Sequence, residues 1–239
     1  MKIIFAGTSH GIPERDRFCS STFLEVDEKV YIIDAGAPIS PLLLRYGLRH
    51  KDVQGVFVTH FHGDHFEGLP EFCDQISWYY LDAQPEIYLP EQRCIDLLQT
   101  WLQSMTKTRQ EHLLLRQYQP GPVYADGTIS VEAIPTRHIP SAHAFRIRAE
   151  DKTLLFTGDM SWGYPEFSLL LGGLQYDLVV CEGAHNTSLA ACSDIFRQAN
   201  TKRLVINHLN PAKTEGIETV QNTFPFEVTL AHDGYTVEL

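Results

Sequence analysis

The chain has 239 residues, 44% hydrophobic and 11% aromatic, a composition that excludes fibrous and intrinsically disordered proteins. Its formal net charge is −11 and its 19 basic residues are scattered, which argues against binding to long nucleic acid. No apolar stretch approaches the ~18 residues of a membrane-spanning helix, and the N-terminal apolar run is too short for a signal peptide. We therefore expect one domain over residues 1–239, cytoplasmic and not bound to a membrane, with five irregularly spaced cysteines as reduced thiols.

Short apolar runs alternate with turn residues along the chain and predict its strands and helices. The predicted strands are, in chain order, residues 2–6, 22–26, 29–33, 53–59, 86–89, 123–134 (a hairpin pair), 144–148, 153–157, 178–181, 204–207, 228–230 and 235–237. The predicted helices are residues 41–47, 94–104 and 188–198, with a further helix that begins near residue 64. Early strands follow one another through hairpins, and later strands alternate with helices. This order predicts a layered α/β domain and excludes a purely parallel sheet.

The strongest motif, Thr-His-Phe-His-Gly-Asp-His, follows an apolar strand. His60 and His62 point to the same side of an extended chain, because side chains alternate along it. The chain then turns at Gly63, and Asp64 and His65 can face the same space from the start of the next helix. Imidazole and carboxylate groups suit Zn²⁺, Mn²⁺ or Fe²⁺. Four candidate ligands are too many for one tetrahedral ion with an open position, so the motif predicts two divalent metal ions, with zinc preferred.

Further ligands are expected from later parts of the chain, where polar residues stand at the ends of apolar strands. His138, Asp159 and His208 each occupy such a position. Ligands in layered α/β proteins collect at the carboxyl ends of strands. We therefore expect these three side chains to join the histidine-rich motif in one metal site.

The order and spacing of these residues resemble the metallo-β-lactamase fold superfamily over essentially the whole chain. The resemblance implies a four-layer αββα sandwich of two mixed β-sheets flanked by helices, with the site at one edge. It implies that one ion is held by His60, His62 and His138. It implies that the other is held by Asp64, His65 and His208, with Asp159 bridging both. Asp34 matches an early aspartate of the superfamily that supports the metal loop without binding metal.

Two segments are similar to the ribonuclease Z-like and phosphodiesterase branch of this superfamily. Residues 7–13 read Gly-Thr-Ser-His-Gly-Ile-Pro and are followed by Arg17 and a Ser-Ser pair. Residues 177–185 contain Glu182, which matches the glutamate of the branch's His-Glu-Ala-Thr segment, and His185, which precedes His208 at nearly the branch's spacing. By this resemblance His185 is the general acid and Glu182 orients it.

The sequence also departs from that branch. Cys181 replaces the histidine of the His-Glu-Ala-Thr segment, and the loop from Glu182 to His185 is much shorter than in the branch. No Gly- and Pro-rich arm for gripping tRNA is present. Together with the negative charge, these departures argue against tRNA processing and leave the geometry of the Glu–His pair open.

The resemblance implies a metal-dependent hydrolase with a dinuclear site, acting on a small or cyclic phosphodiester. Asp64 would hold the nucleophile in line, and His185 would protonate the leaving group. Hydrolysis of a thioester, lactone or other carbonyl substrate on the same site remains an alternative. Di-iron redox chemistry is disfavoured by His62, because such relatives carry Glu there. A non-catalytic metal-binding module also remains open, as does a homodimer.

Overall fold

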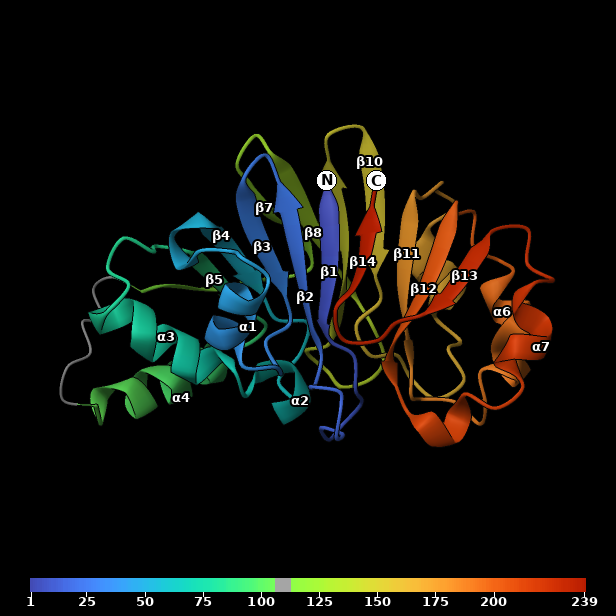
Figure 1. Ribbon diagram of the computed structural model, residues 1–239, viewed down its shortest axis with the longest axis horizontal. Coiled ribbons are helices and arrows are strands. Elements are labelled where there is room, and N and C mark those ends of the chain that lie inside the picture. Colours follow the sequence, from blue (N-terminus) through green and yellow to red (C-terminus); the bar gives the residue numbers. More distant parts are fainter. Residues whose placement is uncertain (106–112) are drawn as a thin grey trace.

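The computed structural model describes residues 1–105 and 113–239, and its strands form two seven-stranded sheets (Figure 1). The first sheet has the order β14 (Tyr235–Glu238), β1 (Lys2–Gly7), β2 (Ser21–Val26), β3 (Lys29–Ile33), β4 (Val53–Phe57), β5 (Glu86–Leu89) and β6 (Leu114–Gln117). The second has the order β13 (Glu227–Leu230), β12 (Arg203–Leu209), β11 (Leu178–Gly183), β10 (Lys152–Phe156), β9 (His143–Ala149), β8 (Ile129–Pro135) and β7 (Gly121–Ala125).

Both sheets are mixed and follow the same plan. β1 to β3 pair antiparallel and β3 to β6 pair parallel. In the second sheet β7 to β10 pair antiparallel and β10 to β13 pair parallel. β14 returns to the first sheet and pairs antiparallel with β1. Each half of the chain therefore builds one sheet, apart from this last strand.

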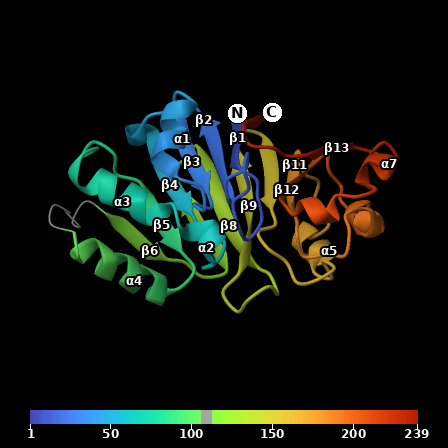
Figure 2. The ribbon, with the colours of Figure 1, turned by 60° about the horizontal axis from the view of Figure 1, so that its bottom comes forward.

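Helices cover the outer face of each sheet, as Figures 1 and 2 show. The first sheet is covered by α1 (Ile39–Arg45), α3 (Leu69–Trp78) and α4 (Gln92–Gln103), and the second by α5 (Phe167–Leu171), α6 (Ser193–Phe196) and α7 (Ile217–Gln221). In α3 the buried residues Leu69, Phe72, Cys73 and Ile76 recur at helical spacing and face the sheet. A further apolar cluster fills the space between the two sheets. The predicted αββα sandwich is confirmed.

Most predicted strands agree with the structure, but the helix predicted over residues 188–198 is wrong in its bounds and its continuity. That segment forms a 3₁₀ turn, η3 (Ala190–Cys192), followed by the single turn α6. The backbone N–H of Leu189 donates to the carbonyl of Lys213 (2.9 Å), which ties the start of this segment to the loop after β12. The expectation of about four helices is also wrong, since the described residues contain seven α-helices and 3₁₀ turns.

No helix in residues 1–105 and 113–239 combines the length and the apolar character that a membrane span requires. All five cysteines are buried and free. The predicted thiols therefore agree with the structure.

Candidate metal centre

All seven predicted ligands meet at one edge of the sandwich, although they come from both halves of the chain. The motif that follows β4 ends in the short helix α2 (Gly63–Phe66), and His208 lies within β12. His138 follows β8, and Asp159 follows β10. The convergence of these strand ends is what the sequence predicted for the site.

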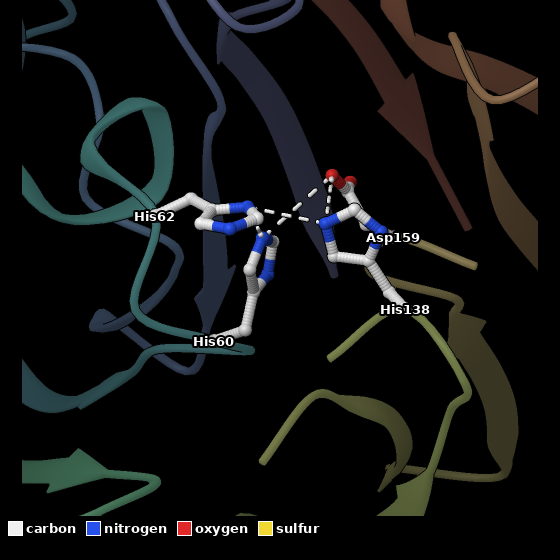
Figure 3. A group of neighbouring side chains, drawn as sticks. All are labelled: His60, His62, His138 and Asp159. Atoms are coloured by element: carbon white, nitrogen blue, oxygen red, sulfur yellow. Dashed lines mark hydrogen bonds and ion pairs between the residues drawn. The ribbon is translucent and has the colours of Figure 1, made fainter. Parts of the chain in front are cut away.

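The first group is the three-histidine cluster of His60, His62 and His138 (Figure 3). His60 Nε2 lies 3.0 Å from His62 Nδ1, and His138 Nε2 lies 3.1 Å from the same Nδ1. The three rings point toward one another and toward Asp159 in the figure. Three ring nitrogens that face one point from two separate backbone segments form a site for a cation.

The second group is the Asp64 cluster of Asp64, His65 and His208. His208 Nε2 lies 2.9 Å from Asp64 Oδ2, and His65 Nε2 lies 3.4 Å from the same oxygen. All three residues are buried, with exposed fractions of 9%, 2% and 4% in that order. A carboxylate and two imidazoles held away from water again offer ligands for a divalent metal.

Asp159 lies between the two clusters and turns one carboxylate oxygen toward each. Its Oδ2 is 3.7 Å from the Nε2 atoms of His60 and His138. Its Oδ1 is 3.4 Å from His65 Nε2 and 3.7 Å from His208 Nε2. One carboxylate can therefore serve two ions, which is the arrangement of a bridging ligand.

Two further observations indicate that these residues are suited to bind metal ions. His65 Nε2 and Asp159 Oδ1 are buried and have no hydrogen-bond partner within the described part of the chain. Buried polar atoms normally have hydrogen-bond partners. Two such atoms that face each other without a partner indicate that a cation binds between them. The separations of 2.9–3.7 Å among the candidate ligands are also close to the ~3.3 Å expected between ligands placed about 2.0–2.1 Å from a tetrahedral ion.

Charges at the centre shift several pKa values in opposite directions. Burial would raise the pKa of Asp159, but the neighbouring histidines, His208 first, hold it well below its usual range. Burial would lower the pKa of His65, but Asp159 and Asp34 outweigh it and raise that pKa well above its usual value. Burial and the adjacent His65 lower the pKa of His60. The centre therefore keeps its carboxylates ionised and ready to bind a cation.

Asp34 supports the centre from behind, at the end of β3. Its Oδ2 accepts a hydrogen bond from His65 Nδ1 (2.8 Å), and its Oδ1 accepts one from the backbone N–H of Thr59 (2.7 Å). The Thr59 hydroxyl also donates to this carboxylate. A proton fixed on Nδ1 of His65 leaves the Nε2 lone pair directed at the metal position. The supporting role predicted for Asp34 agrees with these contacts.

The backbone is strained where three strand ends enter the site. Asp34 and His208 are non-glycine residues with φ of 59° and 51°, a left-handed conformation that side chains disfavour. Gly158, next to Asp159, has φ of 55°, and a Cβ there would lie 2.7 Å from the carbonyl oxygen of His143. Glycine is therefore required at this position for the chain to place Asp159.

The Glu182–His185 pair forms despite the short loop between them. His185 Nδ1 lies 3.0 Å from Glu182 Oε1, and the backbone N–H groups of Ala184 and His185 donate to Glu182 Oε2. The His185 ring lies 4.5 Å from that of His138, measured between centroids. This places His185 at the mouth of the centre, with its side chain 28% exposed.

Two polar residues beside this site are not predicted from the sequence. Lys213 follows β12, donates to the carbonyl of Ala184 (2.8 Å) and lies 4.1 Å from the ring centroid of Trp162. Glu166, just before α5, is 2% exposed and binds the loops that carry His138 and Asp159. Neither belongs to a motif, and only the folded contacts single them out.

Solved structures with similar folds cover the whole chain. YhfI from Bacillus subtilis, described as a metallo-β-lactamase fold protein, superimposes with a TM-score of 0.80 at 21% identity, over 100% of this chain and 99% of that one. The human tRNase Z short form gives 0.77 at 22% identity, over 100% and 99%. A diphosphatase of the PhnP family gives 0.73 at 17% identity, over 100% and 97%. The fold and the residues at its edge thus define a member of the metallo-β-lactamase superfamily, in the ribonuclease Z-like branch that the sequence resembles.

Comparison with sequences gives the particular family. Ribonuclease Z of Acaryochloris marina is 31% identical over 173 residues, which are 69% of this chain and 54% of that protein. Ribonuclease Z of Shouchella clausii is 30% identical over 158 residues, 64% of this chain and 49% of that protein. The chain spans about half the length of these curated relatives. A family model described as "Anti-Pycsar protein Apyc1" matches residues 1–180, and the chain belongs to this family.

Proposed function

We propose that this chain is a phosphodiesterase with a dinuclear metal site, acting on a small or cyclic phosphodiester. The observation that carries the proposal is the position of Asp159, whose two oxygens face the three-histidine cluster and the Asp64 cluster separately. We assign one ion to each cluster, with zinc preferred over manganese or iron. Two such ions, when bound, supply Lewis acidity and positive charge for hydrolysis of a phosphodiester.

We assign to Asp64 the role of positioning the attacking water. Its Oδ2 accepts a hydrogen bond from His208 Nε2 (2.9 Å) in the structure, and the histidines around Asp64 hold its pKa well below the usual range, against the effect of burial. An ionised carboxylate at this place can accept a hydrogen bond from the water and hold the water in line with the scissile bond.

We assign to His185 the role of protonating the leaving group. Its Nδ1 is engaged by Glu182, so its Nε2 remains for the substrate. Burial would lower the pKa of His185, but the hydrogen bond and the charge of Glu182 outweigh it and raise the pKa. The raised pKa favours the protonated ring, which is the form that a general acid needs.

The His185–Glu182 pair favours a phosphodiester over a thioester. An alkoxide that leaves phosphorus requires a proton, whereas thiolate departure from a thioester does not. The alternative of a thioester or lactone hydrolase remains the second candidate, because the same two clusters could activate a carbonyl. A non-catalytic module is disfavoured by the presence of all seven ligand candidates.

The proposal is tested by metal analysis combined with a panel of substrates. Protein purified without chelator is expected to contain two metal equivalents and to hydrolyse bis-p-nitrophenyl phosphate and cyclic nucleotides. Thioesters and lactones serve as the comparison. Turnover of the carbonyl substrates alone would overturn the assignment to phosphodiesters.

The role of His185 is tested by His185→Ala on two leaving groups. We expect a loss of about 100- to 10,000-fold on a phosphodiester with an alkyl leaving group, which is the usual contribution of a general acid. A p-nitrophenyl ester should react at nearly the wild-type rate, because its phenolate leaves unaided. Metal content should not change. The exposed His232, replaced by alanine, is the control, and equal losses on both esters would contradict the assignment.

A further inference from the structure

Two loops bring His138 and Asp159 together, and neither loop belongs to a sheet. Residues 136–142 connect β8 to β9 and carry His138. Residues 157–166 connect β10 to α5 and carry Asp159. Since strand pairing ends before both residues, other contacts must fix the distance between them.

The carboxylate of Glu166 joins these loops. Its Oε1 accepts hydrogen bonds from the backbone N–H of Arg137 (3.0 Å) and from the backbone N–H of Ser161 (2.8 Å). Its Oε2 accepts a bond from the Ser161 hydroxyl (2.6 Å). Arg137 directly precedes His138, and Ser161 is two residues after Asp159. One buried side chain therefore fixes the backbone beside a residue of the three-histidine cluster and beside the bridging aspartate.

This carboxylate does not stabilise the helix that it precedes. Glu166 is the N-terminal flanking residue of α5, but its side chain makes no hydrogen bond to the N–H groups of that helix. It points instead toward the two loops. A residue that only started the helix would use its oxygens on the first turn of α5.

The loop of His138 has a further side-chain anchor in the Ser141 hydroxyl, which donates to Glu91 just before α4 and does not reach the loop of Asp159. The backbone N–H of Thr136 donates to Ala142 and that of Ala142 donates to Ile139, which are bonds within the loop itself. The Thr136 hydroxyl donates to the carbonyl of Asp159 (2.8 Å), which is a second bond between the loops. If the Glu166 carboxylate is removed, the bond from the Thr136 hydroxyl to Asp159 is the one that remains among these hydrogen bonds between the two loops.

We propose that Glu166 is a positioning residue, which holds the backbone of His138 against the loop of Asp159 and so sets the metal affinity of the three-histidine cluster. This inference rests on the proposed dinuclear centre. Partners of metal ligands typically contribute 10- to 100-fold to metal affinity when they fix the orientation of a ligand.

The test measures zinc affinity at both sites by competition with a chromogenic chelator. Glu166→Ala is expected to weaken one of the two zinc sites by about 10- to 100-fold and to leave the other unchanged. Glu166→Gln should stay near the wild-type affinity, because its carbonyl oxygen can still accept from Arg137 and Ser161 while the Ser161 hydroxyl turns to accept from its amide. If Glu166→Ala does not fold, Glu166→Met takes its place, because it keeps the side-chain length without the oxygens.

A double-mutant cycle with His138→Ala separates positioning from general stability. When His138 is absent, Glu166→Ala should cause no further loss of zinc affinity, because its effect passes through His138. The matched control is Asp126→Asn, a carboxylate that also accepts several hydrogen bonds but lies at the opposite end of β8. It should lower the thermal stability of the metal-free protein and leave both zinc affinities unchanged.

Three outcomes would overturn the inference. Unchanged zinc affinities in Glu166→Ala would show that the carboxylate only stabilises the fold. An equal loss in the presence and absence of His138 would show that it acts elsewhere. Full zinc binding by His138→Ala alone would remove the proposed metal centre, and this inference with it.

Discussion

The three-histidine cluster and the Asp64 cluster share Asp159 but differ in how the fold surrounds them. His62 is exposed and the side chain of His138 is 13% exposed, whereas every residue of the Asp64 cluster is at most 9% exposed. The support also differs. His65 rests on Asp34, which is itself buried, while His138 stands on a loop outside the sheets.

This difference predicts unequal metal sites. Ligands that are already fixed lose little freedom when an ion binds, and water reaches a buried ion slowly. We therefore expect the Asp64 cluster to hold its ion more tightly, and the three-histidine cluster to exchange its ion more readily. The two sites of one centre would then respond differently to mutation and to chelators.

The largest effect should follow from removing the residue that the clusters share. Asp159→Ala is expected to lose both metal equivalents and with them all measurable hydrolysis, because one carboxylate serves two ions. Elemental analysis and the rate on bis-p-nitrophenyl phosphate check this. Asp151→Ala, in the turn between β9 and β10, is the control, because its side chain is 81% exposed and pairs with Lys152 at the surface. Full metal content in Asp159→Ala would make Asp159 a structural residue.

The change Asp34→Asn should have an intermediate effect, which is to lower the zinc affinity of the Asp64 cluster alone. If the amide oxygen still accepts from Thr59, the amide NH₂ faces His65 Nδ1, which must then accept. The ring proton moves to Nε2, where the lone pair is needed. Zinc affinity at one site should fall by about 10- to 100-fold. Competition titration measures this, with Asp52→Asn, whose carboxylate pairs with Arg49, as control. An equal loss at both sites would contradict the comparison.

The smallest effect is kinetic and needs no change in the centre. On addition of a chromogenic chelator, the wild-type protein should release its two ions in two phases of equal amplitude. We assign the fast phase to the three-histidine cluster because His62 is exposed. His62→Ala should abolish that phase and keep the slow one. Release in a single phase would show that the two clusters act as one site.

Much of the site could be predicted from the sequence because its residues stand at strand ends. The motif of residues 59–65 contains four of the seven candidate ligands, and apolar strands lead directly to Asp159 and His208. The strands themselves alternate or form buried runs, which are readable patterns. The ligation of metal by these residues stays a prediction, but their convergence is a property of the fold.

Other elements could not be predicted, for physical reasons that differ. α5 and α7 have five residues each, fewer than two helical turns, so neither shows a helical period. β6 is an edge strand with three of its four residues exposed, and its sequence does not alternate. By contrast, α3 carries a readable spacing of buried residues, whereas the sequence-based prediction gives only a helix start near residue 64 and no end. Glu166 acts through backbone groups far away in sequence, and no local pattern predicts such contacts.

The bridging position of Asp159 has a consequence for the stability of the whole sandwich. Asp159 follows a strand of the second sheet, while His60 and His65 follow a strand of the first. An ion bound between them would join the two sheets as a cross-link does, and it would be lost on unfolding. The free energy of unfolding would then rise by about 1.4 kcal/mol for each tenfold increase in free metal above the dissociation constant. The melting temperature of this protein would thus report the metal concentration of its surroundings.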